Sequence, residues 1–170
     1  PLEIWKPTIP VSNKYGALGD DPKWSPKDVE VSGMDDVIGR GRITVDSGAA
    51  EHVMSPNYLT QVPTVPSLGS QTGVHYVVAN GARIPNLGEK RVHFQTSSGQ
   101  ASQILFQVAA VRKPLVSVSR IVEKGNRVVF GPDGSFIESV KTGIRFPMEE
   151  ENGTYFLAVD YLNSGGLGDI

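Results

Sequence analysis

Gly41-Arg42-Ile43-Thr44-Val45-Asp46-Ser47-Gly48-Ala49 is the stretch of sequence that decides the expected fold. The residues up to Val45 follow the alternation of a β-strand, and Asp46-Ser47-Gly48 then ends it. Such a strand delivers the Asp46 carboxylate to the end of a sheet, where Gly48 lets a second backbone approach closely. Asp-Ser-Gly alone is a weak motif, because many surface turns contain it. Its meaning therefore depends on the rest of the chain.

The chain contains 19 glycines and 12 prolines, which separate short apolar runs and predict an all-β domain. Residues 75–79 and 82–84 flank Asn80-Gly81, a pair that supplies the positive φ angles of a tight two-residue hairpin turn. Residues 91–95 alternate again, and the apolar run 103–111 is predicted to be buried on both faces. Residues 56–73 are rich in Pro, Ser, Thr and Gly and are expected to form a surface loop.

The second half of the chain predicts one short helix and two hairpins. Ser117 or Ser119 can cap a helix over residues 121–124, and Gly125 can end it. The expected hairpins join residues 127–130 to 135–137, and residues 144–146 to 155–159 through a loop at 149–153 in which Glu149–Glu151 are solvated.

These elements suggest four regions. Residues 1–36 contain five prolines without a helical or alternating period and are expected to form an extended arm or linker, whose two tryptophans could dock on the domain. Residues 37–126 form the expected core, and residues 127–162 form C-terminal β-hairpins packed on it. Residues 163–170 are Gly-rich and polar, which predicts a flexible tail.

The composition excludes several classes of function. The chain has a net charge of -2 and a pI near 5.9, whereas general nucleic-acid or anionic-membrane binders usually present a basic face. It has no cysteine, which excludes disulfides, thiolate catalysis and Cys-ligated zinc. No stretch is long and apolar enough to span a bilayer. We therefore expect neither a nucleic-acid partner nor a membrane partner.

The order of several motifs resembles the retropepsin-like aspartic proteases, particularly the protease of copia-type LTR retrotransposon polyproteins. The matching stretches are Val45–Met54, Val78–Pro85, Pro114–Arg120, Gly125–Phe130 and Asn152–Leu157. Retroviral relatives have a glycine before the arginine that matches Arg120, whereas this chain has Ser119 there, a departure that the copia branch shares. The implied fold is a retropepsin-like closed β-barrel or sandwich with a flap hairpin and one short helix.

The resemblance also implies a role for each matching residue. Asp46 would be the catalytic aspartate, and Ser47 and Gly48 would brace the active site across a dimer. Arg120 would form a structural pair with Glu51. The substrate would be bound by Ala49, Ala50 and Glu51 together with the flap tip, Ala79, Asn80, Gly81 and Ala82.

This chemistry requires two carboxylates that face one water molecule. The sequence has a single Asp-Ser/Thr-Gly motif, since Asp133-Gly134-Ser135 has the wrong order. The enzyme would therefore be a homodimer with Asp46 of each subunit at a two-fold axis. The resemblance implies an aspartic endopeptidase that processes its own polyprotein without a cofactor or metal, in a cytoplasmic location that could lie within virus-like particles.

Other interpretations stay open. The same fold could serve as a catalytically silent dimerisation or peptide-binding module, with the N-terminal arm blocking the cleft. Arg120 could instead be an ordinary exposed helix residue. Asp46, Glu51 and His52 could suggest a metal site, but on a loop they point in different directions and no fourth ligand is evident. A serine hydrolase would need a Gly-x-Ser-x-Gly elbow, which the chain lacks.

Overall fold

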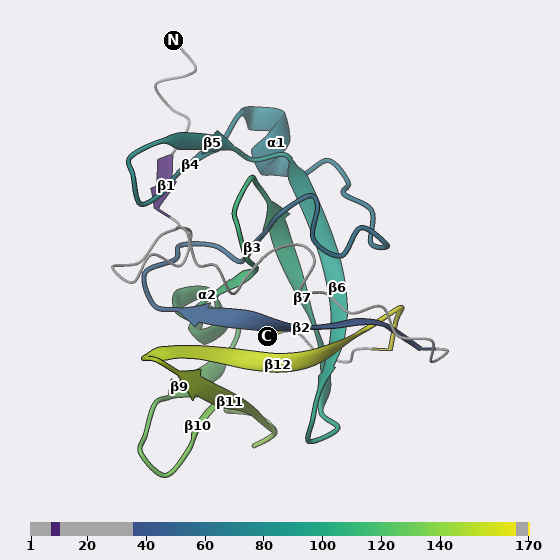
Figure 1. The fold of residues 1–170 in the computed structure, drawn as a ribbon, viewed down its shortest axis with the longest axis vertical. Helices are drawn as coiled ribbons and strands as arrows, with labels where there is room; N and C mark the ends of the chain where they lie inside the picture. The colour runs from purple at the N-terminus through teal and green to yellow at the C-terminus, as the bar shows by residue number, and fades with distance from the viewer. Residues whose placement is uncertain (1–7, 11–35, 166–169) are drawn as a thin grey trace.

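The computed structural model describes residues 8–10, 36–165 and 170, which form a mainly β structure (Figure 1). The expected N-terminal arm lies outside the described residues apart from residues 8–10 and Asp36, as do residues 166–169 of the expected tail. The strands are β1 (Thr8–Pro10), β2 (Val37–Asp46), β3 (Val53–Met54), β4 (His75–Val77), β5 (Arg83–Pro85), β6 (Gly88–Thr96), β7 (Ala101–Val108), β8 (Leu115–Ser117), β9 (Asn126–Val129), β10 (Ser135–Ser139), β11 (Arg145–Glu151) and β12 (Thr154–Leu162), and the helices are α1 (Leu68–Thr72) and α2 (Val118–Glu123).

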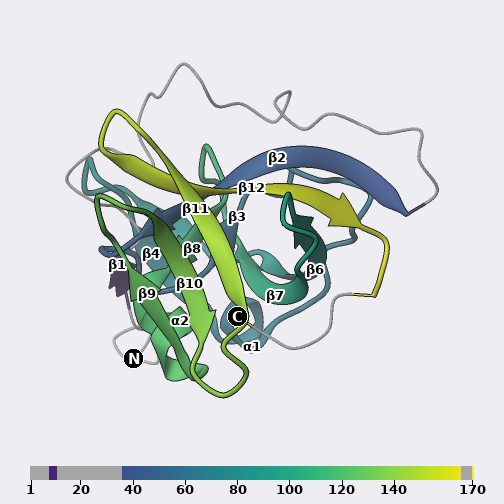
Figure 2. The same cartoon turned by 90° about the horizontal axis from the view of Figure 1, so that it is seen from below.

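Nine strands form one mixed sheet in the order β2-β8-β3-β7-β6-β12-β11-β10-β9. β12 pairs with β2 as well as with β6, so the part of the sheet from β2 round to β12 closes into a ring. β11, β10 and β9 continue outward from β12 as an antiparallel meander (Figure 2). β1, β4 and β5 form a separate three-stranded sheet. β2, which ends at Asp46, therefore has a strand on each side.

The main hydrophobic core gathers alternate residues of the ring strands, such as Ile43 of β2 and Phe106 of β7. Tyr58 and Tyr161 meet in this core, where their hydroxyl groups lie 3.0 Å apart. Gly41 on β2 lies against this pair, and a Cβ atom at Gly41 would be 2.2 Å from the Tyr58 oxygen. Only glycine leaves room for the tyrosine pair at this point of the strand.

The expected surface loop 56–73 is only partly a loop. Tyr58 and Leu59 are buried, and the Lys90 ammonium group on β6 donates hydrogen bonds to their carbonyl oxygens at 2.9 and 3.3 Å. Burial lowers the pKa of Lys90. Further along, α1 begins with a capping box in which Ser67 and Ser70 each accept the backbone N–H of the other. Serine stands where this motif usually has Glu or Gln, so the helix start was hard to predict.

The two Asn-Gly pairs turn the chain in different ways. The predicted β4–β5 hairpin is confirmed, but it closes over residues 79–81, and only Gly81 of the pair has a positive φ, of 83°. The expected two-residue turn there is therefore wrong. The tight turn lies between β11 and β12, where Asn152 and Gly153 have φ angles of 53° and 80°. Glu149–Glu151 belong to β11 rather than to a hairpin loop.

Two further expectations are corrected. β7 alternates between buried and half-buried residues instead of being buried on both faces, and it ends at Val108. The expected single helix is α2, which Ser117 caps, but α1 adds a second one. No helix in the described part of the chain is long and apolar enough to cross a membrane.

Candidate functional site

Asp46 is the last residue of β2, and its register partner on the parallel strand β8 is Ser117. The Asp46 side chain is fully buried, and its Oδ1 atom accepts a hydrogen bond from the Gly48 N–H at 2.7 Å. An aspartate that accepts a backbone N–H two residues on closes a local turn. This turn leaves Ser47 and Gly48 exposed. The carboxylate is therefore held at a rigid strand end, beside an exposed turn.

The loop from Ser47 to His52 is held by the strand-to-helix turn between β8 and α2. The Ser117 hydroxyl donates to the Ala49 carbonyl oxygen at 2.6 Å. The Ser117 backbone N–H donates to Nδ1 of His52 at 3.0 Å. One buried serine thus binds the loop near both of its ends.

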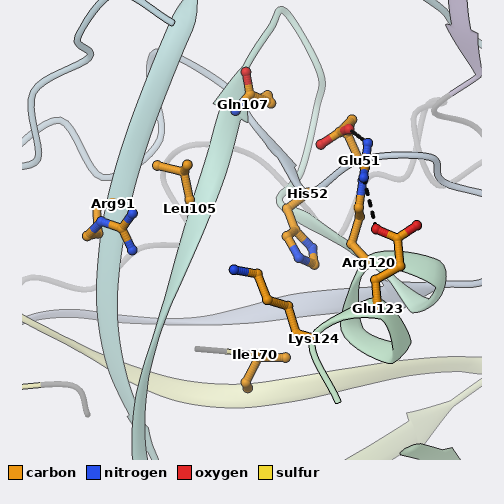
Figure 3. Close-up of a pocket in the computed structure, with 9 residues that line it drawn as sticks. All are labelled: Glu51, His52, Arg91, Leu105, Gln107, Arg120, Glu123, Lys124 and Ile170. Atoms are coloured by element: carbon orange, nitrogen blue, oxygen red, sulfur yellow. Dashed lines mark hydrogen bonds and ion pairs between the residues drawn. The ribbon is translucent and has the colours of Figure 1, made fainter. Parts of the chain in front are cut away.

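Arg120 of α2 holds the middle of the same loop. Its Nε donates to the Ala50 carbonyl oxygen at 3.1 Å, and its guanidinium group forms ion pairs with Glu51 and Glu123 (Figure 3). Burial raises the pKa of Glu51, and the positive charge of Arg120 offsets only part of that effect. The ion pair with Glu51 therefore contributes more to the position of the loop than to stability.

His52, at the end of the loop, is buried and neutral. Because Nδ1 accepts the Ser117 N–H, the ring proton is on Nε2. Burial, followed by the positive charges of Arg120 and Lys124, lowers the pKa of His52 to about 4. The ring also meets Phe106 edge-on, with centroids 6.1 Å apart. His52 thus joins the loop to the core in a form that cannot carry a charge near neutral pH.

The β4–β5 hairpin and the end of β2 lie on the same side of the molecule, on the left of both views, with the hairpin above the end of β2 in Figure 1 (Figures 1 and 2). Its tip, residues 79–82, is exposed, whereas its base is anchored. Tyr76 packs with Val53 in a second hydrophobic cluster, and its hydroxyl accepts a hydrogen bond from Asn86 at 2.9 Å. Burial raises the pKa of Tyr76 to about 12. The hairpin therefore has a fixed base next to the braced loop and a free tip.

A cavity of about 460 Å³ opens beside the braced loop (Figure 3). It is bordered by Glu51, His52, Arg91, Leu105, Gln107, Arg120, Glu123, Lys124 and Ile170. Neither Asp46 nor the hairpin tip lines it. The cavity is therefore separate from the cleft that the sequence predicts between those two features.

The expected site residues fall into two groups. Asp46, at the end of β2, and the loop residues Ser47 to Glu51 form one continuous segment, which Arg120 contacts at Ala50 and Glu51. Ala79, Asn80, Gly81 and Ala82 form the tip of a hairpin in the separate three-stranded sheet. Sequence reasoning did not assign His52 or Ser117 to this site. The position of Ser117 before a predicted helix indicated a capping role. Its bond to His52 was not predictable, because the two residues are 65 positions apart and no local sequence pattern links them.

Among the residues that the structure describes, no three His, Cys, Asp or Glu side chains gather as a metal site would need. Comparisons of the chain with protein families, with curated proteins and with solved structures find no match. The function must therefore be argued from the site itself.

Proposed function

We propose that this chain is one subunit of a retropepsin-like aspartic endopeptidase that acts as a homodimer. The observation that carries the proposal is the fixed Asp46 carboxylate, held at a strand end by the turn to Gly48 and followed by a loop that Ser117 and Arg120 brace. Acid–base catalysis depends on carboxylates held in one geometry, since small displacements of a catalytic group cost much of the rate. The closed ring of strands from β2 to β12 and the β4–β5 hairpin beside the loop also support a retropepsin-like fold.

In the proposed dimer, Asp46 of each copy faces the two-fold axis. Two like charges about 4 Å apart repel by roughly 4 kcal/mol at an effective dielectric constant near 20, so the pair retains one proton over a mildly acidic range. The ionised carboxylate removes a proton from water as the water oxygen bonds to the peptide carbonyl carbon. The protonated carboxyl group donates a hydrogen bond to the carbonyl oxygen. The C–N bond then breaks, and the leaving nitrogen receives the proton that the first carboxylate took from water.

The substrate in this proposal is an extended polypeptide, including the polyprotein that would contain this domain. It would lie between the hairpin and the Asp46 loop as an added strand, so that backbone hydrogen bonds supply affinity and side-chain pockets supply selectivity. We expect apolar residues on both sides of the cleaved bond.

A silent peptide-binding or dimerisation module is the second candidate, and the burial of Asp46 favours it. The exposed fraction of Asp46 is 0% in the single chain. A carboxylate in this state cannot activate water until its surroundings move. An active enzyme therefore requires a rearrangement around Asp46, whereas a silent module does not.

The test compares wild type with Asp46→Asn and Asp133→Asn in peptide cleavage assays from mildly acidic to neutral pH. The amide oxygen of the introduced asparagine can still accept the Gly48 N–H, so Asp46→Asn should fold, and thermal unfolding checks this. Asp133 lies in an exposed turn and provides a matched control. Asp46→Asn should abolish cleavage and Asp133→Asn should retain it. In wild-type and Asp46→Asn mixtures, activity should fall with the square of the wild-type fraction.

Two results would count against the proposal. Cleavage by Asp46→Asn at the wild-type rate would exclude Asp46 as the catalytic group. A wild-type protein that binds peptides as a dimer but cleaves none at any pH would favour the silent module.

A further inference from the structure

The edge of β4 that faces away from β5 is occupied by the N-terminal segment of the same chain. Thr8–Pro10 form β1, which pairs in parallel with β4 in the register Thr8↔His75, Ile9↔Tyr76 and Pro10↔Val77. The sheet order is β1-β4-β5, so β1 adds a third strand to the hairpin. Residues 11–35 separate this strand in the sequence from the domain that it binds.

An unoccupied β4 edge would present unpaired backbone N–H and C=O groups. Such an edge is a template for any extended segment, and strand addition is a common mode of peptide recognition. A two-stranded hairpin is also only marginally stable without a further strand. The position of β1 therefore marks a place where the fold accepts an extended polypeptide.

The backbone of β1 suits reversible occupation. It is only three residues long, and Pro10 has no N–H to offer to a strand on its outer side. Proline at an edge also discourages a further strand from adding outside it. So short a strand would bind weakly as a separate peptide, but its covalent attachment to the domain raises its effective concentration.

The occupied edge belongs to the hairpin beside Asp46. Tyr76, the register partner of Ile9, packs with Val53 directly after the braced loop. Both views place β1 on the left of the molecule, the side on which β2 ends (Figures 1 and 2). A strand that pairs with the free side of the hairpin would therefore meet β1 or replace it.

We propose that the β4 edge is a binding site for extended polypeptide, and that Thr8–Pro10 fills it as a displaceable intramolecular block. The inhibitory consequence rests on the proposed function, because it assumes that a substrate strand reaches Asp46 beneath this hairpin. The strand exchange itself does not depend on catalysis, so the two can be tested separately.

The first test measures amide hydrogen exchange in the full chain carrying Asp46→Asn, which removes any self-cleavage. Ile9→Pro takes away a backbone donor within β1, whereas Pro10→Ala adds one. Exchange at residues 75–77 should become about five- to tenfold faster in Ile9→Pro, which is the effect of losing one backbone hydrogen bond. It should be unchanged or slower in Pro10→Ala. Equal exchange in Ile9→Pro and its parent would overturn the proposal.

The second test adds a synthetic peptide of residues 4–13 to the isotope-labelled Asp46→Asn chain, with and without Ile9→Pro. The peptide should shift the amide resonances of residues 75–77 in the Ile9→Pro chain and bind the parent about five- to tenfold more weakly, because the edge is already filled. Equal binding to both chains would show that β1 does not block the edge. Absence of binding to either would show that the edge is not a polypeptide site.

A third measurement separates this inference from the proposed function. In the chain with Asp46 intact, Ile9→Pro should raise kcat/KM for a peptide substrate by a similar factor, and the peptide of residues 4–13 should reverse the gain. If exchange and peptide binding change as expected but no variant cleaves, the strand site stands and the proposed catalysis fails. If the enzyme cleaves and Ile9→Pro has no effect on kcat/KM, β1 is not an inhibitory block.

Discussion

The Ser117 N–H donates a hydrogen bond to Nδ1 of His52 at 3.0 Å, and this bond links the strand-to-helix turn to the loop that follows Asp46. Only a neutral imidazole has a lone pair at Nδ1 to accept it. The ring is buried and lies near the positive charges of Arg120 and Lys124, so a proton added to it would meet both desolvation and repulsion. The geometry of the candidate site is therefore coupled to the protonation state of His52.

We expect the free energy of unfolding to fall as the pH is lowered from 6.5 through about 4. The pKa of His52 is about 4 in the folded chain, against 6.5 for an ordinary histidine. In this window the unfolded chain binds a proton that the folded chain does not, so acid favours unfolding. The contribution of neutral His52 to the free energy of unfolding is therefore fully present above pH 6.5 and is lost as the pH falls towards 4. The shift corresponds to a contribution of about 3 kcal/mol.

Urea unfolding of His52→Asn across this pH range checks the expectation. Asparagine keeps an acceptor oxygen near the position of Nδ1 but does not titrate, so the curve should become flatter. His52→Phe should be less stable than His52→Asn at every pH, since phenylalanine leaves the buried Ser117 N–H without an acceptor. A His52→Asn curve as steep as that of wild type would contradict the assignment.

Arg120→Lys should lower the free energy of unfolding by about 1–3 kcal/mol, because a lysine ammonium lacks the planar fork of donors with which the guanidinium group reaches the Ala50 carbonyl and both carboxylates. Glu123→Gln is the matched control. It removes only the ion pair with the more exposed partner, so its effect should stay below about 1 kcal/mol. Urea unfolding at neutral pH measures both. Equal destabilisation by Arg120→Lys and Glu123→Gln would mean that the contacts with Ala50 and Glu51 add nothing to the stability that the guanidinium group provides.

Gly41→Ala should destabilise the fold by about 1–3 kcal/mol, because the added methyl group would overlap the Tyr58 hydroxyl in a packed core. Tyr58→Phe removes the hydroxyl oxygen that the methyl group would meet. The double variant should therefore lose less stability than the sum of the two single variants. Thermal unfolding of wild type, the two single variants and the double variant gives a complete double-mutant cycle. Strictly additive losses of stability would argue against a contact between residue 41 and the Tyr58 hydroxyl.

Asn86→Ala should cost more stability than Tyr76→Phe. The Asn86 side chain accepts hydrogen bonds from Ser67 and Gly88 and donates to Tyr76 and Gln107, all at 2.8 to 2.9 Å. Its removal leaves several buried groups unpaired, at a cost of about 1–3 kcal/mol, whereas Tyr76→Phe removes one bond worth about 1 kcal/mol. Chemical denaturation gives the ranking. A larger effect for Tyr76→Phe would place the anchor of the hairpin elsewhere.

Features that depend on neighbouring residues were predictable from the sequence. The end of β2 at Asp46 follows from an alternating run that meets Ser47-Gly48. A capping serine at position 117 or 119 predicts the short helix, although α2 begins at Val118, three residues before the expected range 121–124. Both are local choices, made by turn and cap residues within a few positions.

Features that depend on distant partners were not predictable. Asn80-Gly81 and Asn152-Gly153 are the same dipeptide, but they form different turns because strand register, rather than the pair itself, fixes the loop length. Tyr58 and Leu59 sit in a segment with loop composition, and they are buried where the ammonium group of Lys90 binds their carbonyl oxygens. Contacts of this kind carry no sequence period.

The ring has a consequence for how the chain is made. Arg42 in the middle of β2 and Glu151 at the end of β11 are 109 residues apart in the sequence, and their side chains are joined at 2.7 Å. During synthesis β2 leaves the ribosome before its partner β12, which is the last of the described strands. Long-range pairing of this kind slows folding, and a waiting strand edge favours association with other chains. A nascent chain that stalls before residue 154 would therefore be aggregation-prone and would depend on chaperones to keep β2 available.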